Sequence, residues 1–264
     1  MPNMQFEILP GNINLFSSYE QAIAVDVEAA FQQLQLKNFT AENFKFYTSV
    51  SVISSSKIEG ETMEIDSYVQ HKMQHVEYLP NLTEKPNDLF EAYLFAQKEK
   101  LTKDNFYKAH ILLTTHLLPE KDRGACRKNA MLVMEHKTGR IQYEAAPASK
   151  VTADFDKLWN DITELIHASL NRKEVFYYAS LIHLVFVNIH PFNDGNGRAA
   201  RLLEKWFIVE KLGEKAWYIA SEKYYYKNID AYYGNLAALG MFYEQLDYQK
   251  SIPFLIMLPQ ALTF

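Results

Sequence analysis

Cysteine is almost missing from this sequence, since Cys126 is the only one among 264 residues. A single cysteine forms neither an internal disulfide framework nor a multi-cysteine zinc site. The sequence also lacks a run of about 18 apolar residues, as a membrane helix requires. Its first residues, MPNMQFEILPGN, contain no basic segment followed by an apolar run. We therefore expect a cytoplasmic protein that does not associate with membranes.

Positive charge is not in excess either. The chain has 27 Lys and Arg against 32 Asp and Glu, a formal net charge of -5, which gives no electrostatic basis for binding nucleic acid. Apolar residues make up 48% and charged residues 22%, as in ordinary soluble domains. A chain of this length can bury a large core, so we expect an independent globular protein.

Most of the sequence has helical periodicity. Thr40 and Thr102 each offer an N-cap hydroxyl at a helix start. Spacing of apolar residues predicts helices at about 19–36, 40–60, 63–76, 87–99, 102–117, 151–169 and 174–189. The weakest candidate boundary lies at 79–86, and it suggests an N-terminal helical region over 1–85, a main domain over 86–250 and a C-terminal tail over 251–264.

One segment, residues 129–143, breaks the helical pattern. It contains two short β-compatible runs, separated by His136, Lys137, Thr138 and Gly139. Gly139 can supply the positive φ of a turn between them. The predicted fold is therefore all-α with one small β-hairpin, which must pack on the helices because a lone hairpin is marginally stable.

Residues 188–201 read NIHPFNDGNGRAAR. The preceding helix is nearly all apolar, so His190 stands at the end of a buried and rigid element. Pro191 prevents that helix from continuing unchanged, and the following Asn-Asp-Gly-Asn-Gly run favours a turn. Apolar periodicity resumes at Leu202, with Gly213 as a C-cap signal. The pattern predicts a helix, a tight loop and a second helix.

This loop has the composition of an anion site. Backbone N–H groups and the helix dipole favour an anion at the start of the second helix. Arg198 and Arg201 lie close together in its first turn. An anion with several charges, such as a polyphosphate, would bind both guanidinium groups there. Asp194 would repel that ligand unless it held a divalent cation such as Mg²⁺. His190 can take a proton from an incoming hydroxyl. Each residue alone is also compatible with an ordinary connecting loop.

At every defined position the stretch matches the Fic family signature His-x-Phe-x-Asp/Glu-Gly-Asn-Gly-Arg-x-x-Arg, and the chain resembles Fic proteins over roughly residues 85–250. The resemblance implies transfer of AMP from ATP, with Mg²⁺ as cofactor, to a Ser, Thr or Tyr hydroxyl of a target protein. Pyrophosphate is the other product. The Gly-Asn-Gly sequence favours this reaction over phosphoryl transfer, because the kinase branch of the family departs from it.

The resemblance also implies residue roles. His190 is the implied general base, Asp194 the implied Mg²⁺ ligand, and Arg201 the implied γ-phosphate ligand. Phe192 is implied to anchor the loop, and the phosphate cradle comprises Gly195, Asn196, Gly197 and Arg198. The hairpin corresponds to the family's substrate-aligning flap, comprising Ile141, Gln142, Tyr143, Glu144 and Ala145. Tyr232, with Tyr233, is implied to lie at the nucleotide. Leu239 and Gly240 stand where many relatives have Asn, which leaves base selectivity open.

A shorter motif precedes this core. The sequence Ser55-Ser56-Lys57-Ile58-Glu59-Gly60 resembles the family's inhibitory motif Ser/Thr-x-x-x-Glu-Gly/Asn. Glu59 falls at a predicted helix C-terminus, where the dipole disfavours negative charge, so it needs a cationic partner. The resemblance implies that Arg201 is this partner and that the pair blocks the γ-phosphate position. A solvated acidic helix end is the alternative.

Two other functions stay open. Glu59 can instead position water for hydrolytic removal of AMP from a target, or the motif can bind nucleotide without turnover in a toxin–antitoxin or scaffold protein. The sequence also leaves open the target, self-modification and a homodimer. We expect His183, on a similar helix face to His190, to be a hydrogen-bonded core residue and not a second catalytic group.

Overall fold

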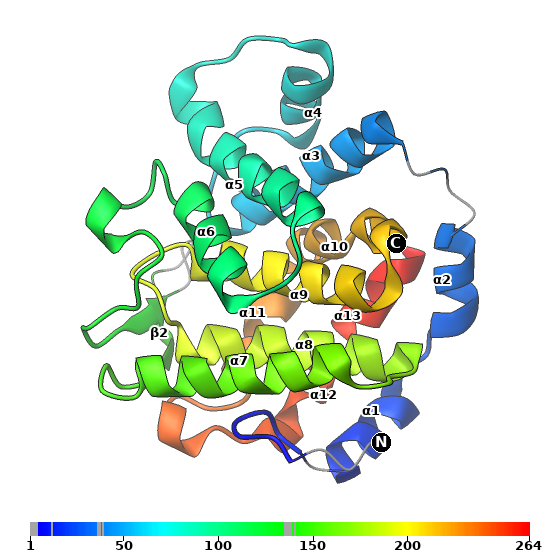
Figure 1. The fold of residues 1–264 in the computed structure, drawn as a ribbon, viewed down its shortest axis with the longest axis vertical. Coiled ribbons are helices and arrows are strands. Elements are labelled where there is room, and N and C mark those ends of the chain that lie inside the picture. The colour runs from blue at the N-terminus through cyan, green and yellow to red at the C-terminus, as the bar shows by residue number, and fades with distance from the viewer. Residues whose placement is uncertain (1–4, 12, 36–37, 39, 135–138, 140) are drawn as a thin grey trace.

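The computed structural model describes residues 5–11, 13–35, 38, 40–134, 139 and 141–264. Two adjacent helices form its centre, α8 (Arg172–Ile189) and α9 (Asn196–Leu212). Figure 1 shows α7 (Val151–His167) beside α8, and α5 (Pro80–Lys98) and α6 (Lys103–Leu113) beside α9. Every residue of α8 from Glu174 onward is buried, as expected for a helix that is apolar all round.

The N-terminal region contains α1 (Ile13–Ala22) and α2 (Val27–Gln35). The single helix predicted over 19–36 is therefore wrong. The side chain of Asp26 accepts a hydrogen bond from the Ala29 backbone N–H at 3.1 Å, which starts a new helix there. Further upstream, the buried Asp161 carboxylate accepts three backbone N–H groups, from Glu7, Ile8 and Leu9, and so fixes the first described segment on α7.

Two predicted N-caps are confirmed. Thr40 accepts from Asn43 N–H at 3.1 Å and begins α3 (Ala41–Ile58), while Thr102 accepts from Asn105 N–H at 3.2 Å and begins α6. Helix α4 (Ile65–Gln74) follows α3. Helix α5 begins at residue 80, with a proline at its N-terminus. The boundary predicted between residues 85 and 86 thus lies inside a helix.

The hairpin comprises β1 (Leu132–Met134) and β2 (Ile141–Glu144), which pair antiparallel. The all-α fold with one small hairpin is confirmed; the predicted turn residues His136, Lys137 and Thr138 lie outside the described residues. The hydroxyl of Tyr143 donates to the Val187 carbonyl at 3.0 Å, so β2 is attached to α8 near its C-terminal end.

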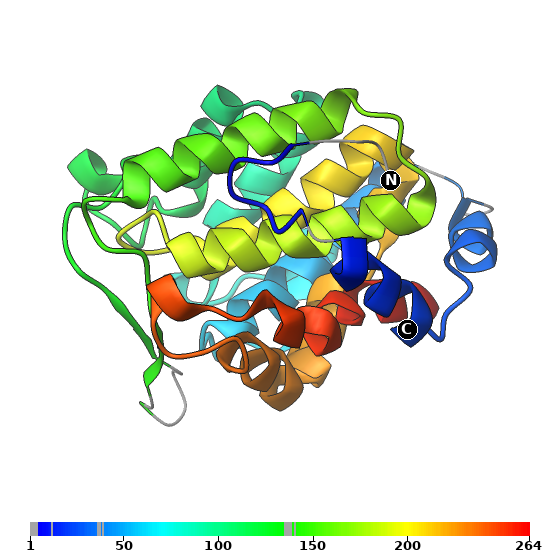
Figure 2. The ribbon, with the colours of Figure 1, turned by 90° about the horizontal axis from the view of Figure 1, so that it is seen from below.

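The C-terminal part of the chain is folded into the core. After η2 (Glu214–Tyr218) it contains α10 (Ser221–Lys227), α11 (Ile229–Ala237), η3 (Tyr243–Gln245), η4 (Tyr248–Ser251), α12 (Ile252–Leu255), α13 (Met257–Gln260) and η5 (Ala261–Thr263). Figure 2 shows α12 and α13 beneath α8. Leu255 and Leu258 are fully buried, so the segment predicted as a tail is a packed element. Within the described residues, no helix combines the length and apolarity needed to cross a bilayer.

Candidate active site

His190 ends α8 in a left-handed backbone conformation, with φ of 52° and ψ of 61°. This conformation is uncommon outside glycine, so the surrounding structure must hold it. The ring Nδ1–H donates to the Val187 carbonyl at 3.2 Å, which leaves Nε2 as the free lone pair of the neutral ring. Burial lowers the pKa of His190 to about 4, although the Val187 carbonyl acts to raise it. The imidazole is therefore neutral near pH 7, as a proton acceptor must be.

Arg127 holds this turn and was not predicted from the sequence. Its buried guanidinium donates to four carbonyls, including that of His190 at 2.7 Å and that of Ile189 at 3.1 Å. The other two belong to Asn129 and Ala146, which flank the hairpin. One side chain thus ties the end of α8 to both arms of the hairpin. No local pattern in the sequence marks such a residue.

The loop after His190 closes on itself. The Asn196 side chain donates to the Phe192 carbonyl at 2.8 Å and accepts from the Phe192 N–H at 2.9 Å. Phe192 is fully buried and stacks on the His110 ring, with centroids 3.6 Å apart. Phe192 therefore lies where an anchor for the loop is needed.

Two glycines of this loop lie where a Cβ would be crowded by neighbouring side chains. At Gly195, where φ is 79°, a Cβ would lie 2.8 Å from the Thr114 methyl group. At Gly197, a Cβ would overlap the Glu59 carboxylate. The backbone at the start of α9 is thus accessible to an approaching carboxylate, and by the same geometry to another anion.

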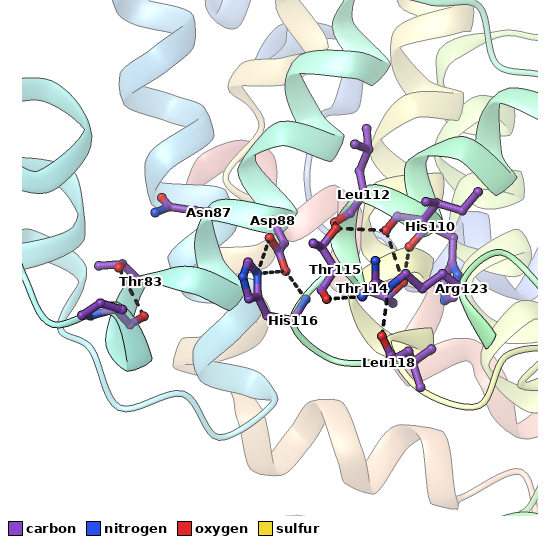
Figure 3. Close-up of polar contacts among 12 residues, drawn as sticks. Thr83, Asn87, Asp88, His110, Leu112, Thr114, Thr115, His116, Leu118 and Arg123 are labelled. Carbon is purple, nitrogen blue, oxygen red and sulfur yellow. Dashed lines mark hydrogen bonds and ion pairs between the residues drawn. The ribbon is translucent and has the colours of Figure 1, made fainter. Parts of the chain in front are cut away.

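The segment after α6 supports this loop from behind. The Asp88 carboxylate accepts the His116 backbone N–H at 2.7 Å, and the His116 ring Nδ1 lies 2.9 Å from the same carboxylate. Figure 3 shows these contacts. Arg123 donates to the carbonyls of Thr115 and Leu118, each at 2.8 Å. These contacts fix the chain next to Thr114, whose methyl group faces Gly195.

Glu59 and Arg201 are in direct contact. Glu59 is the C-cap of α3, and its Oε1 lies 2.6 Å from Arg201 Nη2. Arg201 also donates to the Ser55 hydroxyl at 2.8 Å and the Ser55 carbonyl at 3.1 Å. Burial acts to lower the pKa of Arg201, but the Glu59 carboxylate together with Tyr232 and Tyr233 raises that pKa above its ordinary value. The structure thus brings together the residues expected to form the inhibitory pair, with Gly60 directly after them in a turn at φ of 89°.

A second contact fixes the same helix one turn away. The buried Lys205 ammonium donates to the Ser51 hydroxyl at 2.8 Å and the Ile219 carbonyl at 2.9 Å, and it pairs with Glu222. All three ammonium N–H groups thus have partners. Helix α3 is therefore positioned on α9 by two successive polar contacts.

Tyr232 lies on the opposite side of Arg201. Its hydroxyl is 3.3 Å from Arg201 Nη1 and 2.9 Å from Nε2 of His183. The other ring nitrogen of His183 lies 2.7 Å from the buried Glu204 carboxylate. The expectation that His183 is a hydrogen-bonded core residue is confirmed. Tyr233 instead donates to the Ile58 carbonyl at 3.1 Å, at the end of α3.

One cavity of about 150 Å³ connects these groups. His190, Asp194, Glu59, Arg201 and Tyr232 line it, together with Gly195, Asn196, Gly197, Tyr233, Leu236, Val187 and the hairpin residues Leu132, Val133, Met134 and Tyr143. Ile141 is exposed, Gln142 and Glu144 are half-buried, and Ala145 is buried. Leu132, Val133, Met134 and Tyr143 of the hairpin therefore form one wall of the cavity.

The residues present fit a metal ion shared with a ligand. Asp194 is exposed at the cavity, and its Oδ1 accepts the Gly195 N–H at 2.6 Å. Across the described part of the chain, no group of three or more His, Cys, Asp or Glu side chains is arranged to hold a metal. Mg²⁺ is commonly bound through one or two carboxylates plus ligand phosphates. A single carboxylate at this position suits that mode.

The sequence of this chain is similar to those of known proteins. The sequence model of the Fic/DOC family matches residues 100–208. A curated relative, the protein adenylyltransferase Fic of Nematostella vectensis, is 28% identical over 166 residues, which is 58% of this chain and 35% of the relative. The chain thus spans about a third of that relative's length.

Solved structures share the fold. A Fic family protein from Desulfovibrio desulfuricans G20 superposes with a TM-score of 0.77 at 20% identity, over 98% of this chain and 74% of that chain. A Fic domain containing signaling protein from Bacteroides thetaiotaomicron gives 0.63 at 18% identity, over 95% and 94%. Fic-1 from C. elegans, residues 134–508 with E274G, gives 0.62 at 14% identity, over 95% and 72%. The likeness covers nearly the whole chain, including the region before residue 100.

Proposed function

Because this chain belongs to the Fic family, we propose that it transfers AMP from ATP to a hydroxyl of a target protein and that Glu59 restrains the reaction. The single observation that carries the proposal is the free Nε2 of a neutral His190 on the same cavity as Arg201 and the start of α9. This arrangement offers a proton acceptor beside a site for the phosphates.

In the proposed reaction, Nε2 of His190 takes the proton of the target hydroxyl as its oxygen attacks the α-phosphorus. The bond between that phosphorus and the bridging oxygen breaks, and pyrophosphate leaves. Arg198, Arg201 and the N–H groups at the start of α9 stabilise the phosphate charge. Mg²⁺ held by Asp194 would neutralise part of that charge. The hairpin, with its exposed Ile141, would align the target chain.

Restraint by Glu59 follows from competition for Arg201. The Glu59 carboxylate already holds Nη2 at 2.6 Å, in a contact where the Arg201 side chain is only 1% exposed. A triphosphate that used this guanidinium would have to displace Glu59. The wild-type chain should therefore bind ATP in a way that leaves the γ-phosphate misplaced and the reaction slow.

The test is labelling with ATP that carries the label on the α-phosphorus. We expect little labelling of protein by the wild type, strong labelling of itself or of a lysate protein by Glu59→Gly, and none by Glu59→Gly with His190→Ala. Label on the γ-phosphate should not transfer. Absence of any labelling by Glu59→Gly would favour the non-catalytic alternative, in which the site binds nucleotide as part of a toxin–antitoxin or scaffold protein.

Removal of AMP is a second candidate, because Glu59 lines the same cavity as His190 and its side chain is 22% exposed. A carboxylate there can orient a water molecule for attack on an AMP-modified target. Incubation of the wild type with a pre-modified target separates the two functions. AMP released by the wild type and lost in Glu59→Gly would favour removal.

A further inference from the structure

Glu61 places a second carboxylate against the loop, two residues after Glu59. Its Oε1 lies 3.2 Å from Arg198 Nη2 and 3.1 Å from Lys85 Nζ. The Arg198 side chain is 3% exposed and the Glu61 side chain 14% exposed, so this pair is shielded from solvent far better than a surface ion pair. One carboxylate oxygen thus serves two cations, from α9 and α5.

Glu61 does not satisfy Arg198. The Nε and Nη1 atoms of Arg198 are buried and have no hydrogen-bond partner within the described residues. Unpaired N–H groups on a buried guanidinium cost free energy, which an anion with more oxygens would recover. Arg198 also stands in the first turn of α9, where the dipole opposes a cation. These two observations indicate a site for a larger anion than one carboxylate.

A second cavity, of about 120 Å³, adjoins this cluster. It is lined by Glu59, Glu61, Lys85, Leu117, Asp194, Gly195 and Arg198, and it shares Glu59, Asp194 and Gly195 with the larger cavity. The two cavities therefore meet at the loop, so a phosphate bound at Arg198 would also lie toward Lys85. Leu117 lies between His116 and Leu118, which Asp88 and Arg123 hold by hydrogen bonds, so this wall of the cavity is held in place.

We propose that Glu61 is a second inhibitory carboxylate, which occupies a phosphate-oxygen position between Arg198 and Lys85, and that Lys85 binds nucleotide phosphate once Glu61 leaves. This inference rests on the proposed function, since it adds a regulator and a ligand to the same site. Gly60 separates Glu59 from Glu61, so displacement of this short segment would withdraw both carboxylates. Removal of Glu59 alone would leave Arg198 and Lys85 occupied.

The test compares Glu61→Gln with Glu64→Gln. Glu64 lies in the same segment and its loss changes the charge equally, but its side chain is 76% exposed and pairs with Lys57. We expect Glu61→Gln to tighten binding of Mg²⁺-ATP about tenfold by calorimetry, because a carboxylate no longer competes with phosphate. Glu64→Gln should change the affinity for Mg²⁺-ATP by less than about twofold. Binding of adenosine, which has no phosphate, should be equal in all three proteins.

Lys85→Met tests the second half of the inference and keeps most of the side-chain stem. In the Glu59→Gly, Glu61→Gln background we expect it to weaken Mg²⁺-ATP binding about fivefold without affecting adenosine. Thermal unfolding of each variant is the control for an intact fold. Glu59→Gly with Glu61→Gln should also label protein faster than Glu59→Gly alone.

The outcomes separate this inference from the proposed function. If Glu61→Gln and Glu64→Gln bind Mg²⁺-ATP like the wild type while Glu59→Gly labels protein, Glu61 is not an inhibitory carboxylate and the proposed AMP transfer stands. If Glu61→Gln tightens binding of Mg²⁺-ATP but no variant labels any protein, the competition of Glu61 with phosphate is supported and the proposed AMP transfer is contradicted. If Lys85→Met leaves affinity unchanged, Lys85 is not a phosphate ligand.

Discussion

The Nε2–H of His110 donates a hydrogen bond to the Asp194 carbonyl at 3.0 Å, across 84 residues of sequence. The direction follows from the other ring nitrogen, because Nδ1 lies 3.0 Å from the Gly124 backbone N–H and can only accept from it. His110 is thus held as one neutral tautomer, stacked on Phe192. It fixes the backbone next to the predicted Mg²⁺ ligand without facing the cavity.

The first prediction concerns acid stability. Burial lowers the pKa of His110 to about 4, from 6.5 in the unfolded chain. Below pH 6.5 His110 is therefore protonated in the unfolded state but stays neutral in the folded state, so the free energy of unfolding should fall as pH falls. His110 alone contributes up to about 1.4 kcal/mol per pH unit between these values. Denaturant unfolding at pH 7, 6 and 5 measures the slope.

The matched variant is His110→Gln. Its amide can still bond to one of the two backbone groups, so it should fold with lower stability at pH 7. Its free energy of unfolding should depend less steeply on pH than that of the wild type. Parallel pH dependences for the two proteins would contradict a neutral, buried His110.

The second prediction concerns the pH profile of catalysis. Because burial lowers the pKa of His190 to about 4, the acid limb of kcat/KM should lie well below pH 6.5. The Glu59 carboxylate acts to raise this pKa, so its removal should move the limb lower still. In Glu59→Gly we expect kcat/KM to stay constant from pH 8 to about 5.5. With a histidine of ordinary pKa as the base, kcat/KM would already have fallen about tenfold at the lower pH.

His190→Ala in the same background is the control for that profile. Loss of a general base costs about 10²- to 10⁴-fold in rate, while affinity for Mg²⁺-ATP should persist because the imidazole acts on the hydroxyl. Turnover close to that of Glu59→Gly alone would remove His190 from its proposed role, whatever the shape of the profile.

The third prediction concerns the hairpin. Ile141 is 46% exposed at the edge of β2, so Ile141→Asp should leave the core intact. We expect at least about a tenfold loss in labelling of a protein target, with Mg²⁺-ATP affinity unchanged, because an extended target segment would pair with this strand. Leu79→Asp, at an apolar residue 67% exposed before α5, is the matched control and should label normally. Lost ATP affinity with normal labelling would show that the hairpin serves the nucleotide instead.

Local patterns in the sequence predicted most helices and the motif of the loop. They did not reveal the break before Asp26, because Ile23 and Val25 continue the apolar periodicity and a single capping bond has no periodic signature. The motif residues are contiguous, so a short stretch of sequence carries them. Arg127 and His110 act on the loop from about 60 to 80 residues away through buried hydrogen bonds. A partner from so distant a segment leaves no local pattern.

The last prediction tests whether Glu59 acts through Arg201. Their contact at 2.6 Å implies that Glu59→Gly frees a guanidinium that the triphosphate then uses, so labelling should rise by about tenfold or more. Arg201→Ala should be poorly active, and Glu59→Gly should not restore it, because the group released by the first change is absent. Initial rates of labelling at saturating Mg²⁺-ATP for the four proteins give the coupling between the two sites. An equally large activation in the Arg201→Ala background would show that Glu59 acts through another partner, and no activation in either would leave it an ordinary helix cap.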